Sequence, residues 1–203
     1  MRKKSYYRSA VGEQIIMAQY DGLLARWPVP YELLSVSTRY GKTHIIASGE
    51  PVNPPLLLLH GRSTNATMWV LDIAHYSTHH RVYAVDVLGE PGKSDPVRLK
   101  GQTPDYGEWM RDIFDHLAIR QAIILGISFG SWLAVKSAIL MPDRILGLVL
   151  LSPAGLTYPN PQTIFRAALT LLPSKIWTRR FLESLAVTPL SDEAWELMSP
   201  ILA

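Results

Sequence analysis

The sequence contains no cysteine, which excludes disulfide bonds, thiol catalysis and metal sites built on cysteine. Its longest apolar runs are about as long as a strand, far below the ~20 residues of a membrane-spanning helix. The N-terminus carries Arg2, Lys3 and Lys4 with no apolar run behind them, so we expect no signal peptide. These absences predict a cytoplasmic protein with no membrane partner.

A strong charge of either sign is also missing. Lys and Arg number 20 against 17 Asp and Glu, a net charge of +3, and the basic residues are scattered along the chain. We therefore expect no nucleic-acid partner, because binding to a phosphate backbone needs a basic face. No phosphate-cradling glycine loop follows the first predicted buried strand, and no metal-ligand spacing occurs. The sequence thus predicts neither a cofactor nor a metal site.

What the sequence does contain is an alternation of strand and helix patterns. Residues 11–27 have near-helical apolar spacing, and residues 31–39 and 42–48 look like two strands joined by a Tyr-Gly turn. Continuous apolar runs then predict strands that are buried on both faces. These strands are 56–59, 81–87, 122–125 and 145–151, and the helices between them are 67–77, 103–117 with Thr103 as N-cap, and 131–141. The order predicts an α/β fold with a mostly parallel sheet, in a chain of a length that suits one domain.

The motif that carries most chemistry is Gly-Ile-Ser-Phe-Gly, from Gly126 to Gly130, with Ser128 at its centre. The glycines on either side leave room for neighbouring chains around a strained turn, which exposes the serine between a strand and a helix. The N-terminus of the following helix favours a negative charge that develops there. A chance occurrence in an ordinary glycine turn is the alternative, but the flanking patterns favour a nucleophile elbow.

A second motif, His-Gly-Arg-Ser from His60 to Ser63, follows the first predicted buried strand. Together with the elbow it resembles the α/β-hydrolase fold family, in the esterase-like branch. The resemblance implies an oxyanion hole formed by the backbone N–H groups of Arg62 and Phe129. It also implies that His60 and Gly61 shape the turn, so that His60 is structural and not catalytic.

A third segment, Asp-Val-Leu-Gly-Glu-Pro-Gly-Lys-Ser at residues 86–94, resembles the Asp-x-x-Gly-x-Gly-x-Ser loop of the same family. One extra residue separates the two glycines. In the family this loop packs near the site and is structural. Asp86 is a candidate for the catalytic acid, but its place in this loop, ahead of Ser128, favours a structural role.

No histidine follows Ser128, whereas the family places the catalytic acid and histidine after the nucleophile. The six histidines that precede it are His44, His60, His75, His79, His80 and His116. Five acids follow it: Asp143 is predicted in a turn after a helix, and Glu183, Asp192, Glu193 and Glu196 are predicted on solvated helix faces of the lid. Loss of a triad member leaves only about 10³–10⁴-fold catalysis over water. We therefore predict that this polypeptide alone is a poor catalyst.

The sequence as a whole predicts an α/β-hydrolase-like, mostly parallel sheet with flanking helices, shortened at its C-terminus so that the last core strands are missing. We expect a helical segment over 1–30, a partial hydrolase core over 31–156 and the start of a helical lid over 157–203. The lid would contain helical patches at 162–172, 174–186 and 191–198.

The predicted ancestral activity is hydrolysis of a carboxylic ester through Ser128, with a small-molecule ester-like substrate as the expected partner. Two alternatives stay open. One is a non-catalytic protein that binds a ligand or an interaction partner and keeps the pocket. The other is half of a split enzyme, completed by a second chain that carries the acid and the histidine.

Overall fold

The computed structural model describes Tyr7, residues 9–155 and the single positions 162, 176, 179, 180 and 192. The chain divides into two compact units, residues 1–154 and 155–203. Apart from those single positions, the predicted lid over 157–203 and its helical patches lie outside the described residues. Within the described part of the chain, no helix has the length and apolar character needed to cross a bilayer. The cytoplasmic location stays a prediction.

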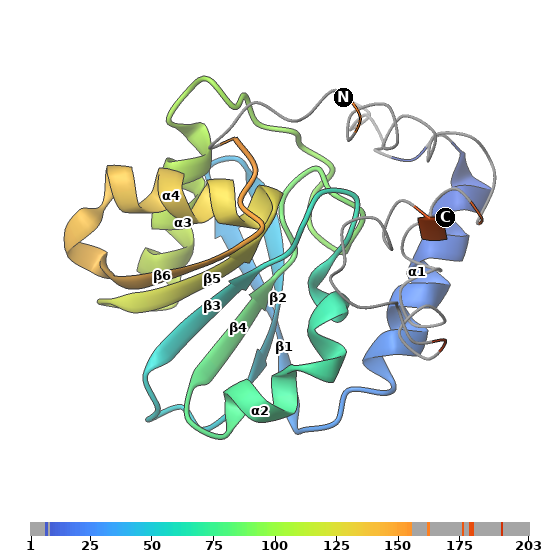
Figure 1. Cartoon of the computed structure of the whole chain (residues 1–203), viewed down its shortest axis with the longest axis horizontal. Helices are drawn as coiled ribbons and strands as arrows, with labels where there is room; N and C mark the ends of the chain where they lie inside the picture. The colour runs from blue at the N-terminus through green and yellow to red at the C-terminus, as the bar shows by residue number, and fades with distance from the viewer. Residues whose placement is uncertain are drawn as a thin grey trace. The chain divides into compact units, whose positions relative to one another are not determined.

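A single six-stranded sheet forms the centre of the described fold (Figure 1). Its strands are β1 (Tyr31–Thr38), β2 (Gly41–Ser48), β3 (Pro55–Leu59), β4 (Arg81–Val85), β5 (Ala122–Ile127) and β6 (Ile145–Leu151). They lie in the order β1-β2-β4-β3-β5-β6. Pairing is antiparallel from β1 to β2 and from β2 to β4, and parallel for the rest. The expected α/β fold with a mostly parallel sheet is confirmed.

This topology brings the two motifs together. β3 and β5 are parallel neighbours, with Leu59 paired to Gly126. Because parallel neighbours run in the same direction, their carboxyl ends meet at one edge of the sheet. The turn that follows β3 and the turn that follows β5 therefore emerge side by side, although more than sixty residues separate them in sequence.

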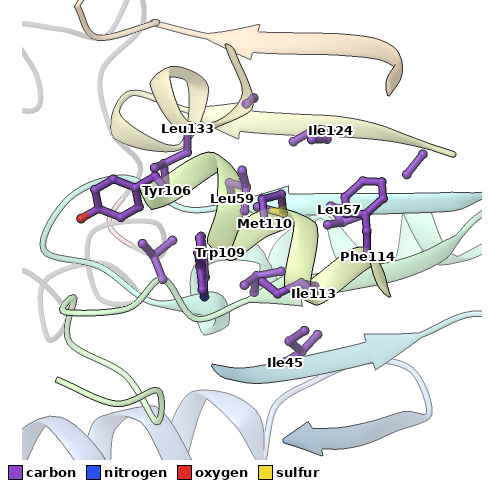
Figure 2. Packing of buried hydrophobic residues seen from close by; sticks show 14 of the residues in the cluster. Ile45, Leu57, Leu59, Tyr106, Trp109, Met110, Ile113, Phe114, Ile124 and Leu133 are labelled. Atoms are coloured by element: carbon purple, nitrogen blue, oxygen red, sulfur yellow. The ribbon is translucent and has the colours of Figure 1, made fainter. Parts of the chain in front are cut away.

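Helices cover both faces of the sheet, with α3 and α4 on one face and α1, η1 and α2 on the other (Figure 1). Their bounds are α1 (Ala10–Leu24), η1 (Ala66–Leu71), α2 (Ile73–Ser77), α3 (Asp105–His116), α4 (Phe129–Leu140) and η2 (Pro142–Arg144). α3 buries an apolar face with helical spacing against the central strands (Figure 2). The buried side chains of this layer include Trp109, Met110, Ile113 and Phe114 from α3, with Leu57, Leu59 and Ile124 from the sheet. Each large side chain buried here contributes about 1.5–3 kcal/mol, which stabilises the strands that carry the motifs.

The single helix predicted over 67–77 is wrong. The structure has the 3₁₀ helix η1 followed by the short α2. The Asn65 side chain accepts the Thr67 N–H at 3.0 Å, and the Asn65 carbonyl accepts the Met68 N–H three residues on, which starts a 3₁₀ turn. Asp72 then ends η1 through its N–H, and its carbonyl begins α2. The apolar spacing alone does not separate a 3₁₀ turn from an α-helix.

The predicted N-cap of the helix over 103–117 is also wrong. α3 begins at Asp105, and the Thr103 hydroxyl donates to the Lys100 carbonyl at 2.9 Å instead of accepting from the helix. The first turn of α3 carries Asp105 and Glu108, whose negative charges suit the positive end of the helix dipole. The Thr103 hydroxyl therefore serves the turn that precedes α3 and does not cap the helix.

β6 forms where it was predicted, but it is not buried on both faces. It lies at one edge of the described sheet. Leu148 and Leu150 pack on the core, whereas Leu146 is 59% and Val149 43% exposed. A continuous apolar run has the same pattern whether or not a neighbouring element covers the strand, so the sequence does not distinguish the two cases.

Candidate active site

Ser128 occupies a sharp turn between β5 and α4. Its backbone has φ 51° and ψ −108°, a combination that residues with a side chain rarely adopt. Three backbone hydrogen bonds hold it there. Its N–H donates to the Leu151 carbonyl at 2.9 Å, and its carbonyl accepts from Trp132 at 3.3 Å and Ala154 at 3.2 Å. A strained serine fixed between a strand and a helix is the geometry of a nucleophile elbow.

The two glycines of the motif are required by the packing around them. A Cβ atom built on Gly126 would lie 2.4 Å from the carbonyl carbon of Gly130. A Cβ atom built on Gly130 would lie 2.1 Å from the Leu59 carbonyl oxygen and 2.8 Å from that of His60. These are backbone atoms, so no side-chain movement would relieve the contact. The glycines thus let the elbow approach the end of β3.

The turn after β3 contacts the elbow directly. A Cβ atom on Gly61 would be 3.8 Å from the Ser128 Cβ. Phe129 is the first residue of α4, and the first amides of a helix have no partner within it. The turn that contains Arg62 and the N-terminus of α4 are therefore neighbours beside Ser128. The two predicted oxyanion donors require this arrangement, and their role stays a prediction.

Both ring nitrogens of His60 are occupied by the backbone. Nδ1 lies 2.8 Å from the Gly61 carbonyl oxygen, and Nε2 accepts the Val87 N–H at 2.9 Å. The ring is fully buried, and this burial lowers the pKa of His60. Among residues 9–155, no hydrogen bond joins the Ser128 hydroxyl to any histidine. His60 connects the turn after β3 to the loop after β4, and the structural role expected for it stays a prediction.

Comparison with known proteins identifies the family. The sequence profile described as alpha/beta hydrolase fold matches residues 54–191. The chain belongs to the α/β hydrolase fold family. Two relatives that the chain matches are named as carboxylesterases, in agreement with the esterase-like branch expected from the sequence. It is 39% identical to "Uncharacterized carboxylesterase nap" of Bacillus subtilis (strain 168), over 76% of this chain and 52% of the relative. It is 43% identical to "Carboxylesterase YbfK" of the same organism, over 66% of this chain and 46% of the relative.

A solved structure shares the architecture. The naproxen esterase (carboxylesterase NP) from Bacillus subtilis superposes with a TM-score of 0.84 at 33% identity, over 97% of this chain and 69% of that one. The chain spans about half the length of the curated carboxylesterases it matches. The elbow at Ser128 and the turn after β3 lie within the region that the α/β hydrolase profile covers.

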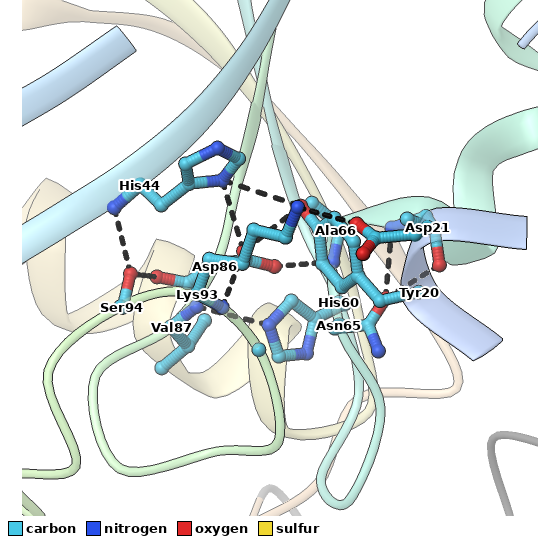
Figure 3. A network of polar contacts seen from close by, with 12 residues as sticks. Tyr20, Asp21, His44, His60, Asn65, Ala66, Asp86, Val87, Lys93 and Ser94 are labelled. Atoms are coloured by element: carbon cyan, nitrogen blue, oxygen red, sulfur yellow. Dashed lines mark hydrogen bonds and ion pairs between the residues drawn. The ribbon is translucent and has the colours of Figure 1, made fainter. Parts of the chain in front are cut away.

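In this α/β hydrolase fold chain, Asp86 is the centre of a buried polar network (Figure 3). Its carboxylate accepts from the Tyr20 hydroxyl at 3.0 Å, the Ala66 N–H at 2.7 Å and the Lys93 N–H at 3.0 Å. His44 Nδ1 lies 3.1 Å from it. Burial alone raises the pKa of Asp86, but the hydrogen bonds from His44 and the Ala66 N–H, together with the charge interactions with His44 and His60, outweigh it, so the pKa lies below its ordinary value. These contacts support the structural role predicted for Asp86.

Sequence reasoning did not find two members of this network, Tyr20 and His44. Tyr20 comes from α1, in the segment to which the sequence assigned no site residue, and His44 comes from β2. Burial, with the neighbouring Asp86 charge, raises the pKa of Tyr20 far above its ordinary value, so its hydroxyl stays a donor. No local motif marks either residue, because the contacts join positions 24 to 66 residues apart. Sequence reasoning also missed Glu90, although the extra residue in its loop was a signal.

The strain at Ser128 is measurable by comparison of two variants. Glycine adopts a positive φ without a steric penalty, whereas alanine keeps the penalty. We expect Ser128→Gly to be more stable than Ser128→Ala by about 1–2 kcal/mol in urea unfolding. Ser128→Ala removes the same hydroxyl and is the matched control. Equal stability of the two variants would contradict the strained conformation.

Proposed function

We propose that this protein acts as a carboxylic-ester hydrolase in which Ser128 is the nucleophile. The observation that carries the proposal is the strained backbone of Ser128 at the β5–α4 turn, because such strain persists at sites where it serves function. The similarity to two carboxylesterases and to a naproxen esterase supports the ester as the substrate class.

The proposed reaction passes through an acyl-enzyme. The Ser128 oxygen attacks the ester carbonyl carbon, and the carbonyl oxygen becomes an oxyanion that the N–H groups of Arg62 and Phe129 stabilise. The carbon–oxygen bond to the alcohol then breaks, and the alcohol leaves with a proton. Water attacks the acyl-enzyme, which releases the carboxylic acid and restores the Ser128 hydroxyl. Each oxyanion donor contributes about 10²–10³-fold to such a reaction.

A serine hydroxyl needs a base to take its proton. The histidines of the chain all precede Ser128, and none in residues 9–155 is hydrogen-bonded to it. We therefore propose that the base and its acid come from polypeptide outside these 203 residues. The coverage of only about half of each curated carboxylesterase relative supports this proposal.

Labelling with a fluorophosphonate tests the nucleophile. The probe forms a bond between the Ser128 oxygen and phosphorus, and fluoride leaves. We expect slow, saturable labelling of the 203-residue chain at Ser128 and none in Ser128→Ala. The rate constant for the chain should be at least ~10³-fold below that of the full-length YbfK carboxylesterase, because the base is missing.

The outcomes separate the two parts of the proposal. Labelling that persists in Ser128→Ala, or that never maps to Ser128 by mass spectrometry, would refute the nucleophile and favour a protein that only binds ligands. Labelling of the chain alone as fast as that of YbfK would instead refute the external base.

A further inference from the structure

The loop after β4 brings a buried carboxylate to the turn that follows β3. Glu90 stands in the segment 86–94, where the chain has one more residue between its glycines than the family pattern, and its side chain is only 1% exposed. A carboxylate is seldom buried unless charged or hydrogen-bonding groups replace its lost water. The partners of Glu90 therefore indicate its role.

Those partners belong mainly to the turn that follows β3. Glu90 Oε2 accepts the Ser63 N–H at 2.7 Å, and Oε1 lies 3.3 Å from Nη1 of Arg62. Arg98, from the same loop region as Glu90, approaches Oε1 at 3.7 Å. A carboxylate thus holds both residues that follow Gly61, through the backbone of one and the side chain of the other.

The backbone bond acts at a strained position. Ser63 has φ 61°, a conformation that a non-glycine residue keeps only when its surroundings impose it. The N–H that Glu90 accepts belongs to the peptide between Arg62 and Ser63. Because a peptide unit is planar, that hydrogen bond fixes the orientation of this peptide, which includes the Arg62 carbonyl. The Arg62 N–H, which is the predicted oxyanion donor, belongs to the preceding peptide and is joined to the held one through the Arg62 Cα.

The side-chain contact reaches the second predicted donor residue. The Arg62 guanidinium lies 4.1 Å from the centre of the Phe129 ring, a distance that suits a cation–π contact. The Phe129 ring is stacked on Trp132 at 5.6 Å and meets the edge of Tyr106 at 5.7 Å. Glu90 therefore connects through the Arg62 side chain to a ring that also contacts two other aromatic side chains.

We propose that Glu90 is a positioning residue for the oxyanion hole, which orients the turn at Arg62 and Ser63 against the N-terminus of α4. The carboxylate does not contact the substrate. It acts through the peptide it binds and through the Arg62 guanidinium, so that the two amide donors keep the spacing that an oxyanion requires. This role rests on the proposed function, in which Ser128 attacks an ester carbonyl.

The test measures the turn and the chemistry separately, in Glu90→Ala and Glu90→Gln. Amide hydrogen exchange of Ser63, read by NMR on the ¹⁵N-labelled chain, reports the hydrogen bond without any need for activity. The rate of fluorophosphonate labelling reports the oxyanion hole. Asp112→Ala is the matched control. Asp112 likewise accepts a backbone N–H, from Arg39 at 2.9 Å, and it also binds the Arg39 guanidinium.

We expect Glu90→Ala to raise Ser63 exchange by at least about tenfold, since a hydrogen bond to a charged group is lost. Labelling of Ser128 should fall by about 10–100-fold, as for the loss of most of one oxyanion donor. Glu90→Gln keeps a side-chain oxygen as acceptor and should recover labelling to within about fivefold of wild type. Asp112→Ala should lower the urea midpoint but change both readouts by less than about twofold.

Each contrary result has its own meaning. Faster Ser63 exchange in Glu90→Ala with unchanged labelling would show a structural contact only and would overturn the positioning role. Unchanged exchange at Ser63 would overturn the contact itself. An unlabelled wild-type chain with a protected Ser63 amide would refute the proposed function, and the positioning role with it, while the contact would stand.

Discussion

Asp86→Asn is expected to lower the free energy of unfolding by about 3–5 kcal/mol at pH 7, the usual cost of breaking a buried charge network. The carboxylate has four hydrogen-bonding neighbours: Tyr20, Ala66, Lys93 and His44. An asparagine of the same shape offers only one accepting oxygen. Its NH₂ group would face donors on the other side, so buried donors would be left without an acceptor.

The loss has a defined pH dependence. The folded pKa of Asp86 lies below its ordinary value, so the stabilisation is fully present above the unfolded pKa of about 3.9. It is lost as the pH falls through the folded pKa. The stability difference between wild type and Asp86→Asn should therefore shrink as the pH falls below about 4. Urea titrations at a series of pH values measure that difference.

Asp21→Asn is the control for this prediction. Asp21 binds the Lys93 Nζ at 2.6 Å, whereas Asp86 accepts the Lys93 backbone N–H, and the Asp21 side chain is 62% exposed. An exposed pair of this kind contributes about 0–1 kcal/mol. A loss in Asp86→Asn no larger than in Asp21→Asn would show that the network of Figure 3 does not stabilise the fold.

The sequence predicted those parts of the fold that depend on local pattern. The apolar runs of β3, β4 and β5 and the glycine spacing around Ser128 are features of a few consecutive residues, and the structure has them in place. Features that depend on distant contacts were not predictable. The exposed face of β6 depends on what packs against it, and the contact of Glu90 with Ser63 joins positions 27 residues apart.

The same distinction applies to the site. The motif predicted where Ser128 would lie, because a nucleophile elbow needs only its two glycines and its flanking strand and helix. Glu90, which we propose to hold the neighbouring turn in place, lies in the loop after β4, where the chain has one residue more than the family pattern. The extra residue was visible in the sequence, but the partners Ser63 and Arg62 of Glu90 are set by the fold and could not be read from the loop alone.

Gly130→Ala is expected to destabilise the protein by about 3 kcal/mol, at the upper end of the cost of overpacking. The new Cβ would meet the carbonyl oxygens of Leu59 and His60 at 2.1 and 2.8 Å. Relief requires the end of β3 to move away from the elbow. Because that end leads into the turn at Arg62, labelling of Ser128 in any chain that remains folded should fall by at least about tenfold.

Gly22→Ala separates this steric effect from the general effect of replacing a glycine. Gly22 lies within α1, and a Cβ atom there would meet nothing within 4 Å. Alanine in a helix is favoured over glycine by roughly 0.5–1 kcal/mol, so Gly22→Ala should raise the urea midpoint and leave labelling unchanged. Both substitutions replace glycine with alanine, but their effects on the free energy of unfolding should have opposite signs. If Gly130→Ala were as stable as wild type, the carboxyl end of β3 would have to be free to move. That result would contradict the prediction that the close approach of the two turns holds the predicted oxyanion hole together.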